Sequence, residues 1–85
     1  MVLLLNCDGS GGGWLKVELQ DAGGRPIPGH SLADADAVVG NAIRKPVAWR
    51  GQGSLNALAG RPVRLRFVMR DIKLYAFQFP KDEEG

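Results

Sequence analysis

Strict alternation of apolar and polar side chains in two stretches constrains this chain more than any other feature. In residues 14–20, apolar residues at positions 15, 17 and 19 alternate with Lys, Glu and Gln. In residues 62–70, Val, Leu, Phe and Met alternate with three Arg and one Val. A period of two is typical of a half-buried β-strand. No long stretch has the 3.6-residue period of an amphipathic helix, so the pattern predicts an all-β fold.

Shorter patterns predict three further strands. Residues 2–7 form an apolar run of the kind found in buried strands. Residues 44–50 form the next strand and place Val47 and Trp49 on one face. Residues 73–79 return as a final strand rich in aromatic side chains.

The connections are predicted from glycine, proline and capping residues. The glycine-rich residues 8–13 predict a flexible hairpin loop between the first two strands. Residues 27–40 predict a long irregular connection with at most one short strand. Ser54 and Gly60 bracket a single helical turn as N-cap and terminal glycine. Residues 71–72 predict a tight corner between the last two strands.

The predicted fold is an antiparallel β-sandwich, jelly-roll-like, with five or six strands and one short helical turn. It forms a single module over residues 1–79, followed by a polar tail over residues 80–85 that we expect to be frayed. The predicted core consists of Leu3, Leu5, Leu15, Val17, Leu19, Val47, Trp49, Val63, Leu65, Phe67, Tyr75, Phe77 and Phe79.

Size and composition narrow the class of protein. The 85 residues suffice for one domain with a thin core. A net charge of +2 is too small to indicate a nucleic-acid partner. The single cysteine, Cys7, excludes an internal disulfide and is predicted as a small apolar strand residue, with a reactive or dimer-forming thiol as the alternative. No segment reaches the roughly 18 apolar residues of a membrane helix, and we expect no signal peptide within the chain.

Asp34 and Asp36 are the only acids close in sequence outside the tail. Alternate positions on an extended segment place both carboxylates on one face, which suits a structural calcium ion. The alternative is that they solvate and cap a loop. Catalysis by paired carboxylates is disfavoured because no second convincing pair exists.

Neither nucleophilic catalysis nor phosphate binding has a convincing motif. His30, the only histidine, is predicted as a surface loop residue because no nucleophile-elbow motif surrounds any Ser or Cys7. The glycine-rich loop lacks the Lys-Ser/Thr of a P-loop and precedes a strand. The chain is therefore not expected to be an enzyme.

Aromatic and arginine side chains are the candidates for carbohydrate binding. Sugar rings stack on exposed aromatic rings, which makes Trp14, Trp49 and Tyr75 candidates. The last two share faces with apolar residues and are expected to fill the core, whereas Trp14 lies out of phase with its apolar neighbours. Guanidinium groups can hydrogen-bond sugar hydroxyls or anionic polysaccharide.

The candidate arginines are Arg64 and Arg66, which share a polar strand face with Arg70. The alternative for this row is a solvated face with cross-strand ion pairs, formed if Lys16 and Glu18 lie on a neighbouring strand.

Two blocks carry a resemblance to a known family. They are residues 15–34, reading LKVELQDA and then PIPGHSLAD, and residues 55–79, reading LNALAGRPVRLRF, then Asp71 and LYAFQF. Together they resemble the C-terminal β-sandwich that follows the catalytic propeller in bacterial glycoside hydrolases of the invertase and fructosidase kind, and in related secreted proteins. The resemblance spans residues 2–79. It differs in two respects: such modules begin with one or two strands before the position of Val2, and they carry an aromatic residue where His30 stands.

The resemblance implies a non-catalytic accessory module, because the catalytic carboxylates of those enzymes belong to the propeller. It implies carbohydrate and a parent catalytic domain as partners, with a secreted or periplasmic location. The alternative function is purely structural: packing on a propeller, or on a second copy as a homodimer through an exposed sheet edge. No cofactor beyond a possible calcium ion, no nucleic acid and no membrane is expected.

Overall fold

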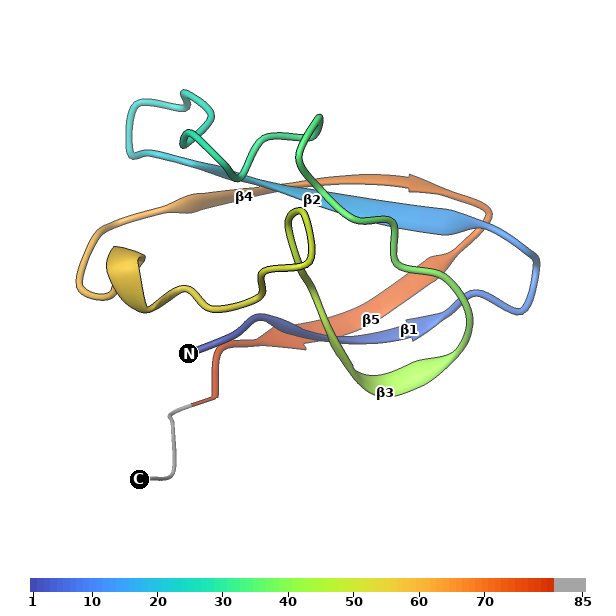
Figure 1. Cartoon of the computed structure of the whole chain (residues 1–85). Coiled ribbons are helices and arrows are strands. Elements are labelled where there is room, and N and C mark those ends of the chain that lie inside the picture. Colours follow the sequence, from blue (N-terminus) through green and yellow to red (C-terminus); the bar gives the residue numbers. More distant parts are fainter. Residues whose placement is uncertain (81–85) are drawn as a thin grey trace.

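The computed structural model describes residues 1–80, which contain five strands and one short 3-10 turn (Figure 1). In chain order these are β1 (Leu4–Asp8), β2 (Trp14–Gln20), β3 (Ala42–Pro46), η1 (Asn56–Leu58), β4 (Arg64–Arg70) and β5 (Lys73–Gln78). They form two antiparallel sheets, one ordered β3-β1-β5 and the other β2-β4. The prediction of an antiparallel all-β fold with one short helical turn is confirmed; the jelly-roll order stays a prediction.

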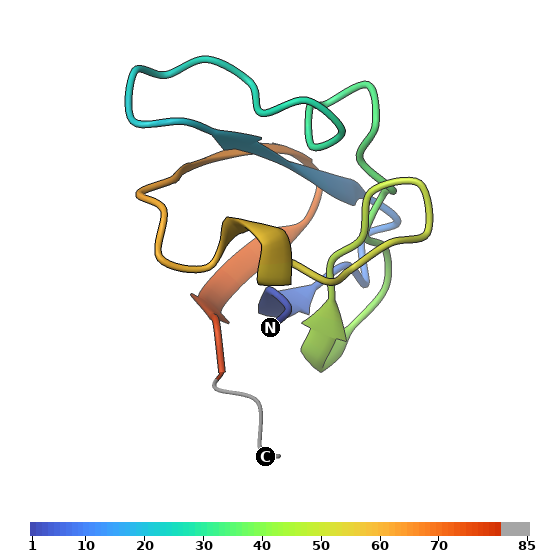
Figure 2. The same cartoon turned by 60° about the vertical axis from the view of Figure 1, so that its left-hand side comes forward.

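The two sheets lie in separate layers and enclose a common core (Figures 1 and 2). From β2, the three alternating residues Leu15, Val17 and Leu19 are buried, as their period of two predicts. Leu5 and Cys7 of β1 face them, so Cys7 is the buried apolar strand residue that the sequence indicated. The described residues include no helix long and apolar enough to cross a membrane.

The predicted hairpin between the first two strands is wrong. β1 pairs with β3 and β5, whereas β2 pairs with β4, so residues 9–13 carry the chain from one sheet to the other. Glycine is needed in this connection because backbone from other segments packs closely against it. A Cβ atom on Gly13 would overlap the backbone carbonyl of Arg70, and one on Gly9 would lie 2.8 Å from the backbone of Gly40.

The predicted corner between the last two strands is also a crossing between sheets. Asp71 adopts a left-handed conformation, with φ of 53°, between β4 and β5. Such a conformation is uncommon for residues other than glycine, although aspartate tolerates it better than most. Residues 9–13 and this corner therefore pack together at one end of the molecule, where both connections cross.

The strand predicted over residues 44–50 ends early, at Pro46, which has no N–H group for the ladder. Val47 and Trp49 are buried as predicted, but they lie beyond β3 in irregular chain. The indole Nε1–H of Trp49 donates a hydrogen bond of 2.8 Å to the carbonyl oxygen of Val17 on β2. Backbone pairing continues here only as single contacts: Val47 donates to the carbonyl of Leu3, and Trp49 forms an isolated bridge with Ala35.

The irregular connection predicted for residues 27–40 covers the free edge of β2. Leu15 and Val38 exchange two backbone hydrogen bonds, of 2.9 and 2.7 Å. Leu19 donates to the carbonyl of His30 and accepts from the N–H of Ile27. This segment therefore acts as a bent third strand beside β2. The helical turn lies where it was predicted, although its N-cap residue is Leu55 rather than Ser54.

The predicted core is wrong at the aromatic residues of β5. Tyr75 is 62% exposed and Phe77 is 49% exposed, although Phe77 lies opposite the buried Leu5 and faces the same way. Phe77 stays uncovered because β4 and β5 are outermost in their sheets, with no further strand beside them. Tyr75 is exposed for another reason: the bulge in the β1–β5 ladder places Leu74, rather than Tyr75, opposite the buried Cys7. The outermost position of the two strands also leaves other predicted core residues only partly buried: Leu65 and Phe67 of β4, and the flanking Val63 and Phe79. Of the predicted tail, residues 81–85 lie outside the described residues.

We predict that Gly13→Ala lowers the free energy of unfolding by about 1–3 kcal/mol or more, because the new methyl group overlaps backbone that cannot move alone. Gly11→Ala is the control: its Cβ would lie 3.3 Å from the carbonyl of Asp71, a contact that a small shift relieves. Urea unfolding measures both. Equal midpoints for the two variants would show that this loop does not depend on close packing.

Candidate functional site

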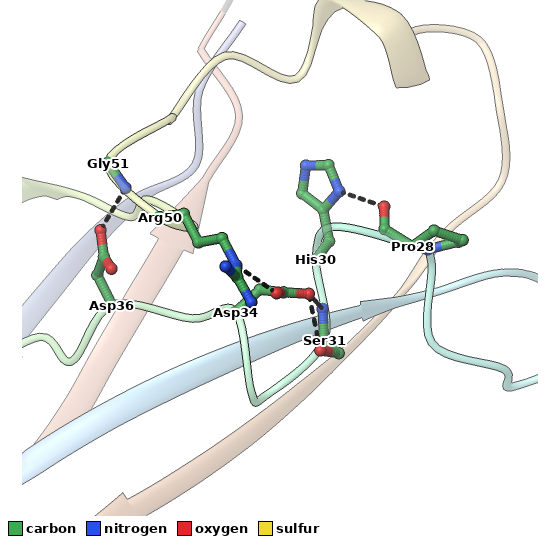
Figure 3. A network of polar contacts seen from close by, with 7 residues as sticks. All are labelled: Pro28, His30, Ser31, Asp34, Asp36, Arg50 and Gly51. Carbon is green, nitrogen blue, oxygen red and sulfur yellow. Dashed lines mark hydrogen bonds and ion pairs between the residues drawn. The ribbon is translucent and has the colours of Figure 1, made fainter.

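Asp34 and Asp36 bind neighbouring loops (Figure 3). The carboxylate of Asp34 accepts hydrogen bonds from Ser31 Oγ at 2.9 Å and from Arg50 Nε at 2.7 Å. The Arg50 contact, followed by that of Ser31, holds the pKa of Asp34 below its usual value. Asp36 Oδ2 accepts from the backbone N–H of Gly51 at 2.9 Å. The two carboxylates thus fasten the connection after β2 to the turn at residues 49–52.

These contacts match the loop-capping alternative for the two acids. Within residues 1–80, no group of three His, Cys, Asp or Glu side chains gathers as a metal site would require. The calcium ion stays a prediction. His30 does not join the carboxylates: its Nδ1 lies 3.4 Å from the carbonyl of Pro28 (Figure 3). Its ring centroid lies 5.0 Å from that of Trp49.

A second group of candidates lies on the surface of the β2–β4 sheet that faces away from the core, here called the outer face. Register places Trp14 opposite Arg70, Glu18 opposite Arg66 and Gln20 opposite Arg64. Lys16 extends its ammonium group to 5.9 Å from the centroid of the Trp14 ring, a cation–π distance. The outer face consists of Trp14, Lys16, Glu18, Gln20, Arg64, Arg66, Val68 and Arg70. The neighbouring-strand arrangement proposed for Lys16 and Glu18 is therefore observed.

Glu18 departs from the solvated-face alternative, because only 4% of it is exposed. Its carboxylate accepts a hydrogen bond of 2.8 Å from Gln20 Nε2 and one of 3.2 Å from the N–H of Leu32. The bond from Gln20 is the main cause that lowers the pKa of Glu18, with the Leu32 N–H and the Arg66 charge adding to it against the cost of burial. Residues 27–34, which fold beside it, cause this burial, and alternation within one strand does not reveal them.

A third surface lies between the exposed margins of the two sheets, here called the open side. Leu65, Phe67 and Met69 of β4 lie opposite buried residues of β2 and so face inward. Leu74 and Phe77 of β5 lie opposite Cys7 and Leu5 and also face inward. Yet Met69 is 47% exposed, close to the value for Phe77. The Phe67 and Phe77 rings, 5.4 Å apart between centroids, join the two strands across this side.

The predicted carbohydrate residues do not form one site. Trp14, Arg64 and Arg66 share the outer face, and Trp14 is half-buried there. Tyr75 is exposed on β5, in the other sheet. Trp49 is buried and cannot offer its ring to a ligand at the surface. Sequence reasoning overlooked Met69 and Phe77 as surface residues, because strand order alone decides which apolar face stays uncovered.

Comparison with protein-family models, with curated proteins and with solved structures finds no match for this chain.

We predict that Glu18→Gln lowers the free energy of unfolding at neutral pH by about 1–3 kcal/mol, because a buried charged acceptor is lost and Gln20 faces an amide in its place. The folded-state pKa of Glu18 lies below its usual 4.5, so its stabilisation is present above that pH and is lost as pH falls through the lowered value. The difference between wild type and variant should therefore shrink in acid. Urea unfolding at several pH values measures it.

Asp71→Asn is the control for this experiment, because that carboxylate is exposed at the corner between β4 and β5. It should change the free energy of unfolding by less than about 0.5 kcal/mol. A Glu18→Gln effect that is equally small, or that grows in acid, would contradict the assigned role of the buried carboxylate.

Proposed function

We propose that this chain is a non-catalytic accessory module, of the kind that follows the catalytic propeller in bacterial glycoside hydrolases, and that it associates with a second copy of itself through the open side. The single observation that carries the association is the inward-facing but uncovered apolar surface of β4 and β5. The family assignment is supported by the sequence resemblance over residues 2–79.

Burial energetics favour covering this surface. Fully burying a Phe or Met side chain contributes about 1.5–3 kcal/mol, and Phe77 and Met69 each leave about half of that area in water. Their partly buried neighbours Leu65, Phe67 and Leu74 extend the surface along both strands. A contiguous exposed apolar patch of this kind marks an interaction site in soluble proteins.

The edges of the sheets point to β5 as the strand that pairs. Exposed edges are normally protected by charges or proline. β3 carries Arg44, Lys45 and Pro46, and β4 carries three arginines. β5 has no charge after its first residue, Lys73, and its only irregularity is a bulge in the ladder with β1.

Pairing with a second copy keeps the charges of the β5 edge apart. Antiparallel pairing of β5 with itself about a two-fold axis is self-complementary. It places the two Lys73 side chains at opposite ends of the joint, separated by most of the roughly 20 Å length of a six-residue strand. The same pairing of β4 would bring its arginines close to each other. Charge repulsion therefore disfavours the β4 edge and leaves β5 free to pair.

The test compares wild type with Phe77→Lys and Val39→Lys by sedimentation equilibrium. Wild type should be a dimer, and Phe77→Lys should be a folded monomer because a charge enters the joint. Val39→Lys, a change at a 56% exposed residue of the connection beside β2, should remain dimeric. A strictly monomeric wild type at high concentration would contradict self-association. If such a monomer bound a dye that reports exposed apolar surface, the open side would more readily be explained by packing against a different polypeptide. Equal behaviour of the two lysine variants would also count against the proposal.

Carbohydrate binding is the second candidate function, favoured by the outer face. Trp14 is half-exposed there, opposite Arg70 and beside Lys16. An aromatic ring therefore lies next to the hydrogen-bond donors of two cationic side chains. This combination suits the apolar ring faces and the hydroxyl groups of a sugar.

We predict that the purified chain is retained by at least one soluble or insoluble polysaccharide, and that Trp14→Ala abolishes the retention. Pull-down and affinity electrophoresis measure both. Tyr75→Ala, a change to an exposed aromatic residue of the other sheet, is the matched control and should retain binding. Lack of retention on every polysaccharide, or equal loss in both variants, would contradict a carbohydrate site on the outer face.

A further inference from the structure

We infer that the outer face binds an anionic, carboxylate-bearing polysaccharide; this inference rests on the carbohydrate-binding candidate above and names its ligand class. The outer face holds four cationic side chains, Lys16, Arg64, Arg66 and Arg70, and one carboxylate, Glu18. Its net charge of about +3 thus exceeds the +2 of the whole chain.

The one carboxylate of this face leaves its cations largely uncompensated. Glu18 is buried and accepts from Gln20 and Leu32, so only Arg66 approaches it, at 3.8 Å. Arg70 lies 3.9 Å from Asp71, with both side chains mostly exposed, and such pairs contribute little. Arg64 forms no ion pair with any of residues 1–80.

The arrangement of these cations favours a polymer over a small ligand. Arg64 and Arg70 stand at the two ends of β4, about 20 Å apart along an extended strand. Three hollows of the structure are lined by residues outside the outer face: one of about 240 Å³ beside Ile43 and Phe77, one of about 420 Å³ beside Asp8 and Asp71, and one of about 210 Å³ between Leu58 and Phe79. A row of cations along an open strand suits repeated anions along an extended chain.

The chemistry of the donors favours carboxylated sugars among such polymers. The planar guanidinium fork matches a carboxylate with two parallel hydrogen bonds. Trp14, opposite Arg70, adds a surface for the C–H face of a sugar ring at one end of the row. Single-stranded nucleic acid would need several stacking aromatic side chains along its path, and Trp14 is the only aromatic residue on this face.

The test is affinity electrophoresis of the whole chain in polygalacturonate and in neutral dextran, with a single-stranded oligonucleotide as competitor. Retention by polygalacturonate should exceed retention by dextran and should fall as salt is raised. The double variant Arg64→Gln/Arg66→Gln should weaken it about three- to tenfold, as the loss of two exposed charge contacts implies. Arg25→Gln/Arg44→Gln removes equal charge from exposed residues elsewhere and should change it by less than about twofold.

Each outcome separates this inference from the function on which it rests. Binding to dextran as tight as to polygalacturonate, and lost in Trp14→Ala, would keep the carbohydrate function and overturn the anionic class. Binding to neither would overturn both. Equal weakening by the two arginine double variants, or displacement by the oligonucleotide at matched charge concentration, would show general polyanion attraction and overturn the inference.

Discussion

The indole of Trp49 attaches the irregular segments of this small protein to strand β2. Its Nε1–H donates to the carbonyl of Val17 in the middle of β2, and its ring packs beside His30. Its backbone forms a tight turn with Gln52. Five short strands bury too little surface to hold a core alone. Of the thirteen residues in the buried cluster, eight lie outside the five strands: Leu3, Ile27, Ala35, Val38, Val47, Trp49, Leu55 and Leu58. The core therefore depends on how these loops attach to β2.

The loops close only one side of the core. Residues 26–38 pair along β2, and the carboxylates of Asp34 and Asp36 fasten that segment to the turn beyond Trp49. Figure 2 shows these segments and β3 on one side of the molecule and β5 on the opposite side. On that opposite side, no comparable segment of residues 1–80 packs over the apolar residues of β4 and β5. The exposure of Phe77 and Met69 is thus the consequence of an asymmetric fold rather than of a poor apolar pattern.

This asymmetry explains which features the sequence could reveal. The period of two located β2 and β4 and separated their faces correctly, because side-chain alternation is a local property of a strand. Partner choice is not local: the loop of residues 9–13 crosses between sheets, and nothing in its glycines distinguishes that path from a hairpin. Val47 and Trp49 alternate like strand residues because both are buried, although Pro46 ends the ladder before them. The burial of Glu18 was invisible for a similar reason, since a segment distant in sequence covers it.

Glu18 also links the fold to the charge of the outer face. A solvated carboxylate at this position would be free to approach the guanidinium groups across the ladder. Held by Gln20 and by the backbone of Leu32, it instead anchors the covering segment and lies near only one guanidinium group, that of Arg66, at 3.8 Å. The hydrogen bonds offset the cost of burying that charge, which is why its pKa falls despite burial. The same contacts that attach residues 27–34 to β2 therefore leave Arg66 as the one guanidinium group near Glu18 and leave Arg64 exposed without an ion pair to any of residues 1–80. The positive charge of this face thus depends on how the loop is held.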